Sequence, residues 1–415
     1  MLVPDRPPAA GAIVRDRLET LERLWPGSAS EVVGWSRQAP DTLRRDTRHW
    51  SLVSARGGAQ ILVPDSPSLR RAALRGFGSV GMTDRARGAV AGFMHRGQPL
   101  VLTRHVTITS PSRDPSIEAH LSDVLGRPVS VAVWLDANQG DGVLILQVLD
   151  DAADTVAFAK VATTPRSREL VRAEAQALKT LAGVRLTHVS APASLYHGGW
   201  QGLEVMVETP LLSRSRRRGD SHLMLAAMRE VSLCSEVTVE PLVNSRYLAR
   251  LQSRLESLRG DEANAMLHRA LGELVRASGN VPWWFGSWHG DLTAGDAPVG
   301  DDGRLQIWGW RHFTAPVPCG FDALHRALHA SLRRVTGGRR AVTTLLDDAA
   351  RALRGWSVPA GQQPMVVLAY LVDIGARYLR TEQSGLSGPV PPLHTWLLPP
   401  LARETQRLSN ARPSG

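Results

Sequence analysis

The stretch that decides the fold is residues 156–181, which read VAFAKVATTPRSRELVRAEAQALKTL. Residues 156–162 have the composition of a β-strand, and side-chain alternation places Phe158 and Lys160 on one face of it. Residues 166–181 have the apolar spacing of an amphipathic helix, and Glu174 falls within the apolar stripe. Because an unpaired carboxylate is costly to bury, we predict an ion pair between Lys160 and Glu174. A glutamate at the helix edge that reaches water is the alternative left open by the helix alone.

The sequence on either side of this stretch predicts a two-lobed α+β protein. Strands are expected at 129–135, 143–149 and 156–162, joined by Asn/Gly/Asp turns, and two more near 193–197 and 203–207. Helical periodicity then dominates, over 221–278, 321–334, 340–353 and 364–381. We therefore expect a five-stranded N-lobe at 125–208 and a helical C-lobe at 209–415. A small α/β N-terminal region at 1–124 precedes them, and the sequence assigns it no role. A cleft between two such lobes is a usual place for a ligand.

A second set of chemistry-bearing residues lies at 288–296, WHGDLTAGD. Asp291 follows a glycine in a stretch rich in tryptophan, which is a setting for a partly desolvated carboxylate that acts as a general base. A His-Gly-Asp tripeptide alone is more often a turn. Its position downstream of Lys160 and Glu174 gives the tripeptide more weight.

Taken together, these motifs resemble the aminoglycoside phosphotransferase and choline kinase family, which has the protein-kinase-like fold. The resemblance covers residues 125–405 and includes the strand at 305–308 and the helix start at 320–325, GFDALH. It implies that Lys160 holds ATP phosphates and pairs with Glu174, and that Asp322 supports the catalytic loop. It also implies that Asp291 accepts the proton of the attacking hydroxyl. The remaining site residues implied by it are His289 in the catalytic loop, Asp296 as a metal ligand, and Val205, Val207 and Glu208 at the segment that contacts adenine.

The sequence departs from the family pattern where the metal should bind. Asp296 stands in place of the loop asparagine, although its oxygen can still bind a hard cation. The metal-bridging aspartate corresponds to Gly309, and the acid two residues later corresponds to Arg311. Phosphoryl transfer depends on metal positioning, so such a loss should cost roughly two decades in rate, on the order of 3 kcal/mol. The pattern argues for a degenerate Mg²⁺ site.

Two functions follow from the resemblance. We favour a catalytically impaired, pseudokinase-type module that binds ATP or serves as a scaffold for a protein partner. The alternative is an active ATP-dependent phosphotransferase that acts on a hydroxyl group of a small molecule. The substrate itself cannot be read from the sequence.

Composition excludes other classes of function. The chain has 415 residues, 43% of them hydrophobic, and a net charge of +10. Of its 49 basic residues only Lys160 and Lys179 are lysines, so the charge indicates a bias toward arginine rather than a nucleic-acid surface. The basic run at 214–218 lacks interleaved aromatic residues and is interpreted as a solvated loop rather than a polyanion site. No apolar stretch is long enough to cross a membrane, the N-terminus lacks the apolar core of a signal peptide, and only two cysteines occur; we expect a cytoplasmic protein.

The sequence also contains a competing set of candidate metal ligands. Asp322, His325 and His329 recur at helical spacing and could be metal ligands. Capping and packing roles explain the same residues, and no further ligand is evident. No nucleophile elbow or dinucleotide fingerprint occurs in the sequence.

Overall fold

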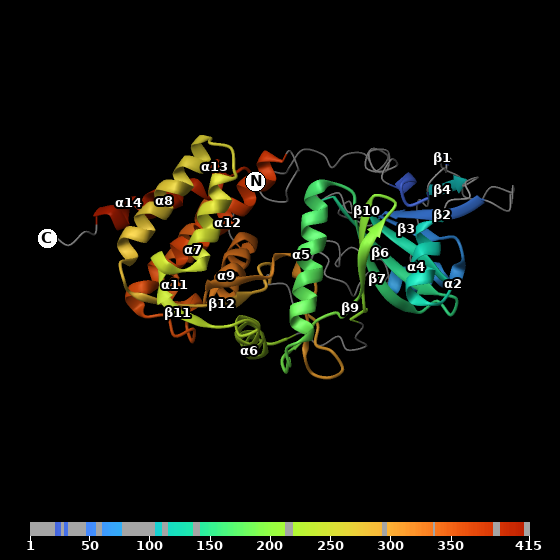
Figure 1. Cartoon of the computed structure of the whole chain (residues 1–415), viewed down its shortest axis with the longest axis horizontal. Helices are drawn as coiled ribbons and strands as arrows, with labels where there is room; N and C mark the ends of the chain where they lie inside the picture. The colour runs from blue at the N-terminus through green and yellow to red at the C-terminus, as the bar shows by residue number, and fades with distance from the viewer. Residues whose placement is uncertain are drawn as a thin grey trace. The chain divides into compact units, whose positions relative to one another are not determined.

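The computed structural model describes residues 21–25, 29–31, 47–54, 60–76, 104–109, 115–135, 142–211, 219–292, 297–334, 337–384 and 391–410. The chain divides into two compact units. The sheet unit consists of residues 1–179, 191–216 and 306–311, and the helical unit of residues 180–190, 217–305 and 312–415. Together they make a mixed α+β protein (Figure 1).

The sheet unit contains a nine-stranded antiparallel sheet among its described residues. Its order is β1 (Ala29–Glu31), β4 (Arg104–Thr109), β2 (Thr47–Ser54), β3 (Gln60–Pro64), β5 (Val129–Leu135), β6 (Val143–Asp150), β7 (Thr155–Ala162), β10 (Leu203–Glu208) and β9 (Ser194–Trp200).

The sheet is larger than the sequence led us to expect. The five strands predicted between residues 125 and 208 are present as β5, β6, β7, β9 and β10. Four strands from the first 124 residues continue the same sheet, because β3 pairs with β5 from Gln60 opposite Leu135 to Leu62 opposite Val133. The N-terminal region and the expected N-lobe therefore share one sheet.

Helices cover both faces of this sheet. On one face, α4 (Ile117–Leu125) packs on an aliphatic cluster that includes Val205 and Val207. The other face carries Lys160, whose direct cross-strand partners are Ile145 and Met206. On this Lys160 face, α2 (Pro67–Gly76) packs against β3, β6 and β7, and α5 (Pro165–Ala182) reaches Lys160 through Glu174. Figure 1 shows α5 as the long green helix beside β10.

The helical unit is built around α12 (Gln363–Gln383), whose residues from Val366 to Ala376 are all buried. A helix that is apolar on all sides must be surrounded by other elements. Here α7 (Arg246–Glu256), α8 (Glu262–Ser278), α9 (Phe321–Arg334) and α14 (Leu398–Asn410) pack against α12. The other α-helices among the described residues of this unit are α6 (Ser221–Ser232), α10 (Gly338–Asp347), α11 (Ala349–Ala352) and α13 (Leu393–Trp396).

Short strands support one edge of the helical unit. β12 (Pro282–Trp288) lies between β11 (Thr238–Pro241) and β14 (Thr314–Pro318) in an antiparallel sheet. A shorter pair joins β8 (Val189–Ser190) and β13 (Leu305–Gln306). The strand β12 ends at Trp288, so it delivers the His-Gly-Asp tripeptide at its C-terminal end.

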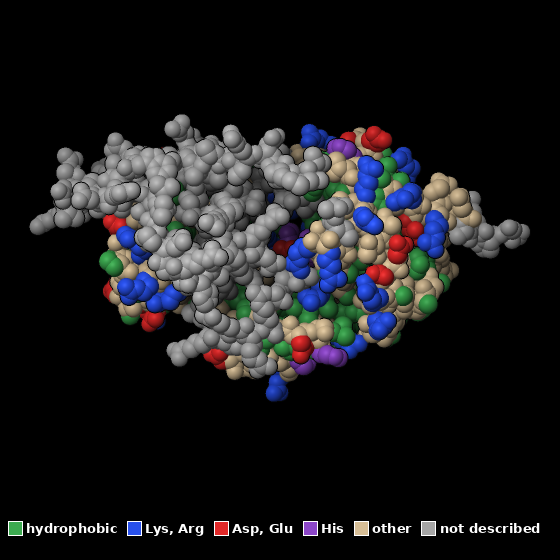
Figure 2. Space-filling model, turned by 180° about the vertical axis from the view of Figure 1, so that it is seen from behind, with side chains coloured by type: hydrophobic (Ala, Val, Ile, Leu, Met, Phe, Trp, Pro, Cys, Tyr) green, Lys and Arg blue, Asp and Glu red, His purple; other side chains and the backbone are tan. Residues whose placement is uncertain are grey.

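The described surface carries charges of both signs. Figure 2 shows basic side chains (blue) and acidic side chains (red) side by side on the face of the helical unit. The basic run at 214–218 lies outside the described residues. Within the described part of the chain, no helix is both long enough and apolar enough to cross a bilayer.

Candidate functional site

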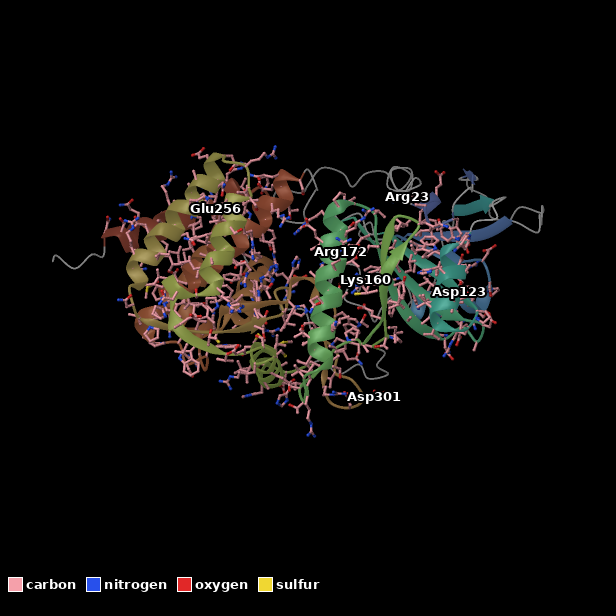
Figure 3. All side chains as sticks on the ribbon, viewed as in Figure 1. Arg23, Asp123, Lys160, Arg172, Glu256 and Asp301 are labelled. Carbon is pink, nitrogen blue, oxygen red and sulfur yellow. The ribbon has the colours of Figure 1, made fainter. Side chains whose placement is uncertain are left out.

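The first candidate site is a buried charge cluster in the sheet unit around Lys160, which is labelled in Figure 3. The Nζ atom of Lys160, on β7, lies 2.6 Å from Oε1 of Glu174 on α5. The predicted ion pair is therefore present, and the alternative of a glutamate that reaches water is wrong, because Glu174 is only 2% exposed. Burial on its own would lower the pKa of Lys160, but the charges of Glu174 and Glu208 outweigh burial and raise it.

A third member of the cluster, Glu208, contributes a second carboxylate. It ends β10, and its Oε1 lies 2.9 Å from the same Nζ atom. Because Glu208 is fully buried and close to the negative charge of Glu174, its pKa rises to about 7 despite the nearby ammonium. The family resemblance implied that Glu208 lies in the segment that contacts adenine, but it did not reveal the contact of Glu208 with Lys160. Its position opposite Phe158, two residues from Lys160 on the same face, could have suggested it once the strand register was known.

The segment at 306–311 contacts the same cluster. The backbone N–H of Trp310 donates a hydrogen bond of 2.9 Å to Oε1 of Glu174. Trp310 is fully buried, and its indole donates to the carbonyl of Ile307. Between them Gly309 has a φ of +78°, and a Cβ atom added there would meet no atom within 4 Å. The position that the resemblance assigns to the metal-bridging carboxylate is thus next to the Lys160 cluster and has room for a side chain.

The other expected adenine contacts lie in the core. Val205 and Val207 are fully buried on the sheet face opposite Lys160, in the cluster under α4. Their backbone belongs to a strand that is paired with β7 on one side and β9 on the other. The backbone N–H of Thr209 also donates a hydrogen bond to the carbonyl of Ala193, directly before β9.

The second candidate site is the loop after β12 in the helical unit. Asp322, near the start of α9, accepts hydrogen bonds from the backbone N–H groups of His289 (2.8 Å) and Gly290 (3.1 Å). The Nη1 atom of Arg377 donates to the carbonyl of Gly290 at 2.5 Å. Because Asp322 is buried, its pKa rises to about 7 even though these N–H groups favour its ionised form. Asp322 thus makes the contact with the loop that the resemblance implies.

Among the described residues of this loop, Asp291 has the accessible carboxylate. Its side chain is 38% exposed, and Oδ1 lies 3.7 Å from Nε2 of the fully buried His325. Burial on its own would raise the pKa of Asp291, but the neighbouring rings of His325 and His312 and the charge of Arg377 outweigh it and lower the pKa. Asp291 is therefore ionised at neutral pH. A carboxylate in this state can accept a hydrogen bond from a substrate hydroxyl or bind a cation.

His289 points its ring back at its own loop. The Nδ1 atom of His289 accepts a hydrogen bond of 3.2 Å from the backbone N–H of Asp291. The residue is 2% exposed, so it shapes the loop from within. Two residues that support the loop, Arg377 and Tyr370, were not identified from the sequence. Tyr370 lies 3.0 Å from Nδ1 of His325, and only the packing of α12 against α9 brings them together.

The described residues contain no group of three His, Cys, Asp or Glu side chains that could hold a metal ion. Asp322 is hydrogen-bonded to backbone N–H groups and His325 to Tyr370, so the helix-spaced set with His329 is engaged in packing and loop support. Burial and the neighbouring His325 lower the pKa of His329 to about 3. Asp296, the expected metal ligand, lies outside the described residues.

No protein-family model matches this sequence, and no curated protein is significantly similar to it. Three similar solved structures are phosphotransferases or related kinases. A candidate fructosamine-3-kinase from Haemophilus somnus 129PT is 13% identical, with a TM-score of 0.42 over 70% of this chain and 96% of that one. The gentamicin complex of APH(2")-IIa is 13% identical, with a TM-score of 0.38 over 73% and 97%. The aminoglycoside phosphotransferase APH(3'')-Id from Streptomyces rimosus, bound to ADP and streptomycin, is 12% identical, with a TM-score of 0.35 over 56% and 93%. Similarity at this level does not by itself assign this chain to a family.

Proposed function

We propose that this chain is a kinase-like protein that binds a nucleotide through Lys160 and has lost most phosphotransfer activity. The observation that carries the proposal is the arrangement around Glu174. Its Oε1 atom binds both the Lys160 ammonium and the backbone N–H of Trp310, directly after Gly309. Glu174 is in place to hold Lys160 for a phosphate, whereas Gly309, directly before Trp310, provides no carboxylate for a metal.

The lysine suits a phosphate ligand. An ammonium is a compact point charge that binds phosphate oxygens, whereas a guanidinium needs a planar, bidentate partner. In a chain where 47 of 49 basic residues are arginine, a buried lysine that contacts a helix glutamate is a specific choice. Against the effect of burial, Glu174 and Glu208 together raise the pKa of that ammonium, and Glu174 holds it at 2.6 Å.

The same residues do not fit a Mg²⁺ site. Mg²⁺ prefers near-octahedral oxygen ligands and is usually bound by one or two carboxylates together with substrate phosphates. At the position next to the lysine cluster the chain has Gly309, and two residues later Arg311 brings a positive charge instead of an acid. We therefore propose nucleotide binding with little dependence on Mg²⁺, and we assign no chemical step to the metal.

Thermal melts test this proposal. ATP at about a hundredfold excess over its Kd should stabilise the folded protein by about 2.7 kcal/mol, which gives a shift of several degrees. The shift should be similar with and without Mg²⁺ and should disappear in Lys160→Ala. Melting points that do not move with ATP under any condition would overturn the proposal and leave Lys160 and Glu174 as a structural ion pair.

A variant with a restored carboxylate tests the metal site directly. Gly309→Asp restores a carboxylate at a position with open space, and aspartate tolerates a positive φ better than most residues. We expect the ATP-dependent shift of this variant to become larger when Mg²⁺ is added. Gly303→Asp is the matched control, because Gly303 has a φ of +79° and equally open space but belongs to the turn before β13.

The second candidate is an active phosphotransferase, which the exposed and ionised Asp291 favours. In this case Asp291 would accept the proton of a substrate hydroxyl, with Asp296 as a remaining metal ligand. The test is ATP consumption in the presence of small hydroxylated compounds, compared between the wild type and Asp291→Asn. Turnover that depends on both Mg²⁺ and Asp291 would favour this candidate over the impaired kinase.

A further inference from the structure

The Lys160 cluster contains one more negative charge than positive charge. Lys160, Glu174 and Glu208 are 7%, 2% and 1% exposed, so water screens none of them well. A single ammonium serves two carboxylates. Buried charges that are not fully compensated are costly, so the cluster holds one carboxylate that is poorly satisfied.

Glu208 is that carboxylate. Glu174 accepts hydrogen bonds from the Lys160 ammonium and from the Trp310 backbone. Glu208 lies 2.9 Å from the same ammonium, and no second hydrogen-bonding group is found for either of its oxygens among the described residues. If another anion approached Lys160, displacement of Glu208 would therefore break fewer interactions than displacement of Glu174.

The position of Glu208 also suits a side chain that changes place. It is the last residue of β10, and the pairing with β9 shifts in register between Val207 and Glu208. Such irregularities re-aim a side chain and end the regular ladder. A local change there would leave the pairing of the earlier residues of β10 intact.

We propose that Glu208 acts as an internal competitor that occupies the ammonium of Lys160 in place of a nucleotide phosphate. This proposal rests on the proposed function of Lys160 and adds how that site is controlled. A phosphate group brings oxygen acceptors and negative charge of the same kind as the Glu208 carboxylate. Bound phosphate and ionised Glu208 exclude each other because both need the same buried cation. Removal of the Glu208 charge should therefore tighten nucleotide binding.

Calorimetric titration with ATP, and separately with inorganic tripolyphosphate, tests this at pH 8 without Mg²⁺. We expect Glu208→Gln to bind both probes at least about tenfold more tightly than the wild type, which is about 1.4 kcal/mol. Glu204→Gln is the matched control. Glu204 lies on the same strand and the same sheet face, but it pairs with Arg172 and His197 rather than Lys160. The Glu204→Gln variant should bind both probes with the affinity of the wild type.

Two further variants separate the possible outcomes. Glu208→Leu also removes the charge and should give the same gain in affinity, so it replaces Glu208→Gln if the glutamine variant does not fold. The gain must vanish in Glu208→Gln combined with Lys160→Ala. Equal affinity in the wild type and both Glu208 variants would overturn the proposed competition by Glu208 while leaving the proposed function intact. Absence of binding in all variants would overturn both the competition and the proposed function. A gain in affinity shared by Glu204→Gln would show a nonspecific charge effect and overturn the proposed competition.

Discussion

The sheet unit and the helical unit each place a carboxylate among charged or titratable partners, but the balance of charge is opposite in the two. Around Lys160 two glutamates share one ammonium, and the pKa of Glu208 rises to about 7. Around Asp291 the neighbours are His325, His312 and Arg377, and the pKa of this acid falls. The surroundings, rather than the residue type, decide which carboxylate can become protonated near neutral pH.

The two carboxylates therefore have different roles, although both are acidic residues in candidate sites. An acid whose pKa is near neutrality can change its charge in response to pH or to a ligand. An acid whose pKa is lowered stays ionised and keeps one role. The Lys160 cluster is therefore adjustable, and the loop with Asp291 is fixed by its partners.

The largest effect should come from Lys160→Ala in the sheet unit. Removal of the ammonium leaves two buried carboxylates without a cation, which typically costs about 3–5 kcal/mol. Denaturant unfolding at pH 8 should show this loss, and the loss should shrink at pH 5, where Glu208 is protonated. An equal loss at both pH values would show that the cluster does not carry the excess charge we describe.

The next largest effect should come from Asp322→Ala in the helical unit. This change leaves the backbone N–H groups of His289 and Gly290 buried without their acceptor, at about 1–3 kcal/mol each. We expect a loss of about 3 kcal/mol in the free energy of unfolding. Asp301→Ala, at an exposed turn position of the same unit, is the control and should change stability by less than about 0.5 kcal/mol.

A pH-dependent effect should follow from Glu208→Gln. The folded-state pKa of Glu208 is about 7, above its ordinary value of 4.5, so the folded protein binds this proton more tightly than the unfolded chain. The resulting stability is complete below pH 4.5 and is lost as the pH rises through 7. Glutamine does not titrate, so the free energy of unfolding of the variant should rise relative to that of the wild type over this range, by about 3 kcal/mol at pH 8. Parallel stability curves for the two proteins would contradict the assignment.

The smallest effect should come from Arg172→Gln. Arg172 on α5 pairs with Glu204 on β10, so it joins the same helix and sheet as Lys160 and Glu174 do. Its side chain is 62% exposed, and water and salt screen such pairs. We expect the melting temperature to stay within about 1 °C of the wild type. A shift comparable to that of Lys160→Ala would mean that burial is not what distinguishes the two pairs.

Local patterns predicted much of the fold. The helix at 321–334 is present as α9 (Phe321–Arg334), and the helix at 364–381 is present within α12 (Gln363–Gln383). The segment 282–288, PWWFGSW, was not predicted as a strand, and it forms β12 between β11 and β14. A run of aromatic residues has no clear period, so its conformation depends on the strands that pair with it.

The sequence by itself determined the Lys160–Glu174 ion pair, because strand alternation, helical spacing and the cost of an unpaired buried carboxylate leave few other solutions. It also determined that position 309 has no carboxylate. Only the tertiary structure decided that Glu208 joins this pair and that Val205 and Val207 face the opposite core. It also decided that Asp322 accepts from the loop at 289–290. These facts depend on strand register and on contacts between residues far apart in the chain, and neither is set by local propensity.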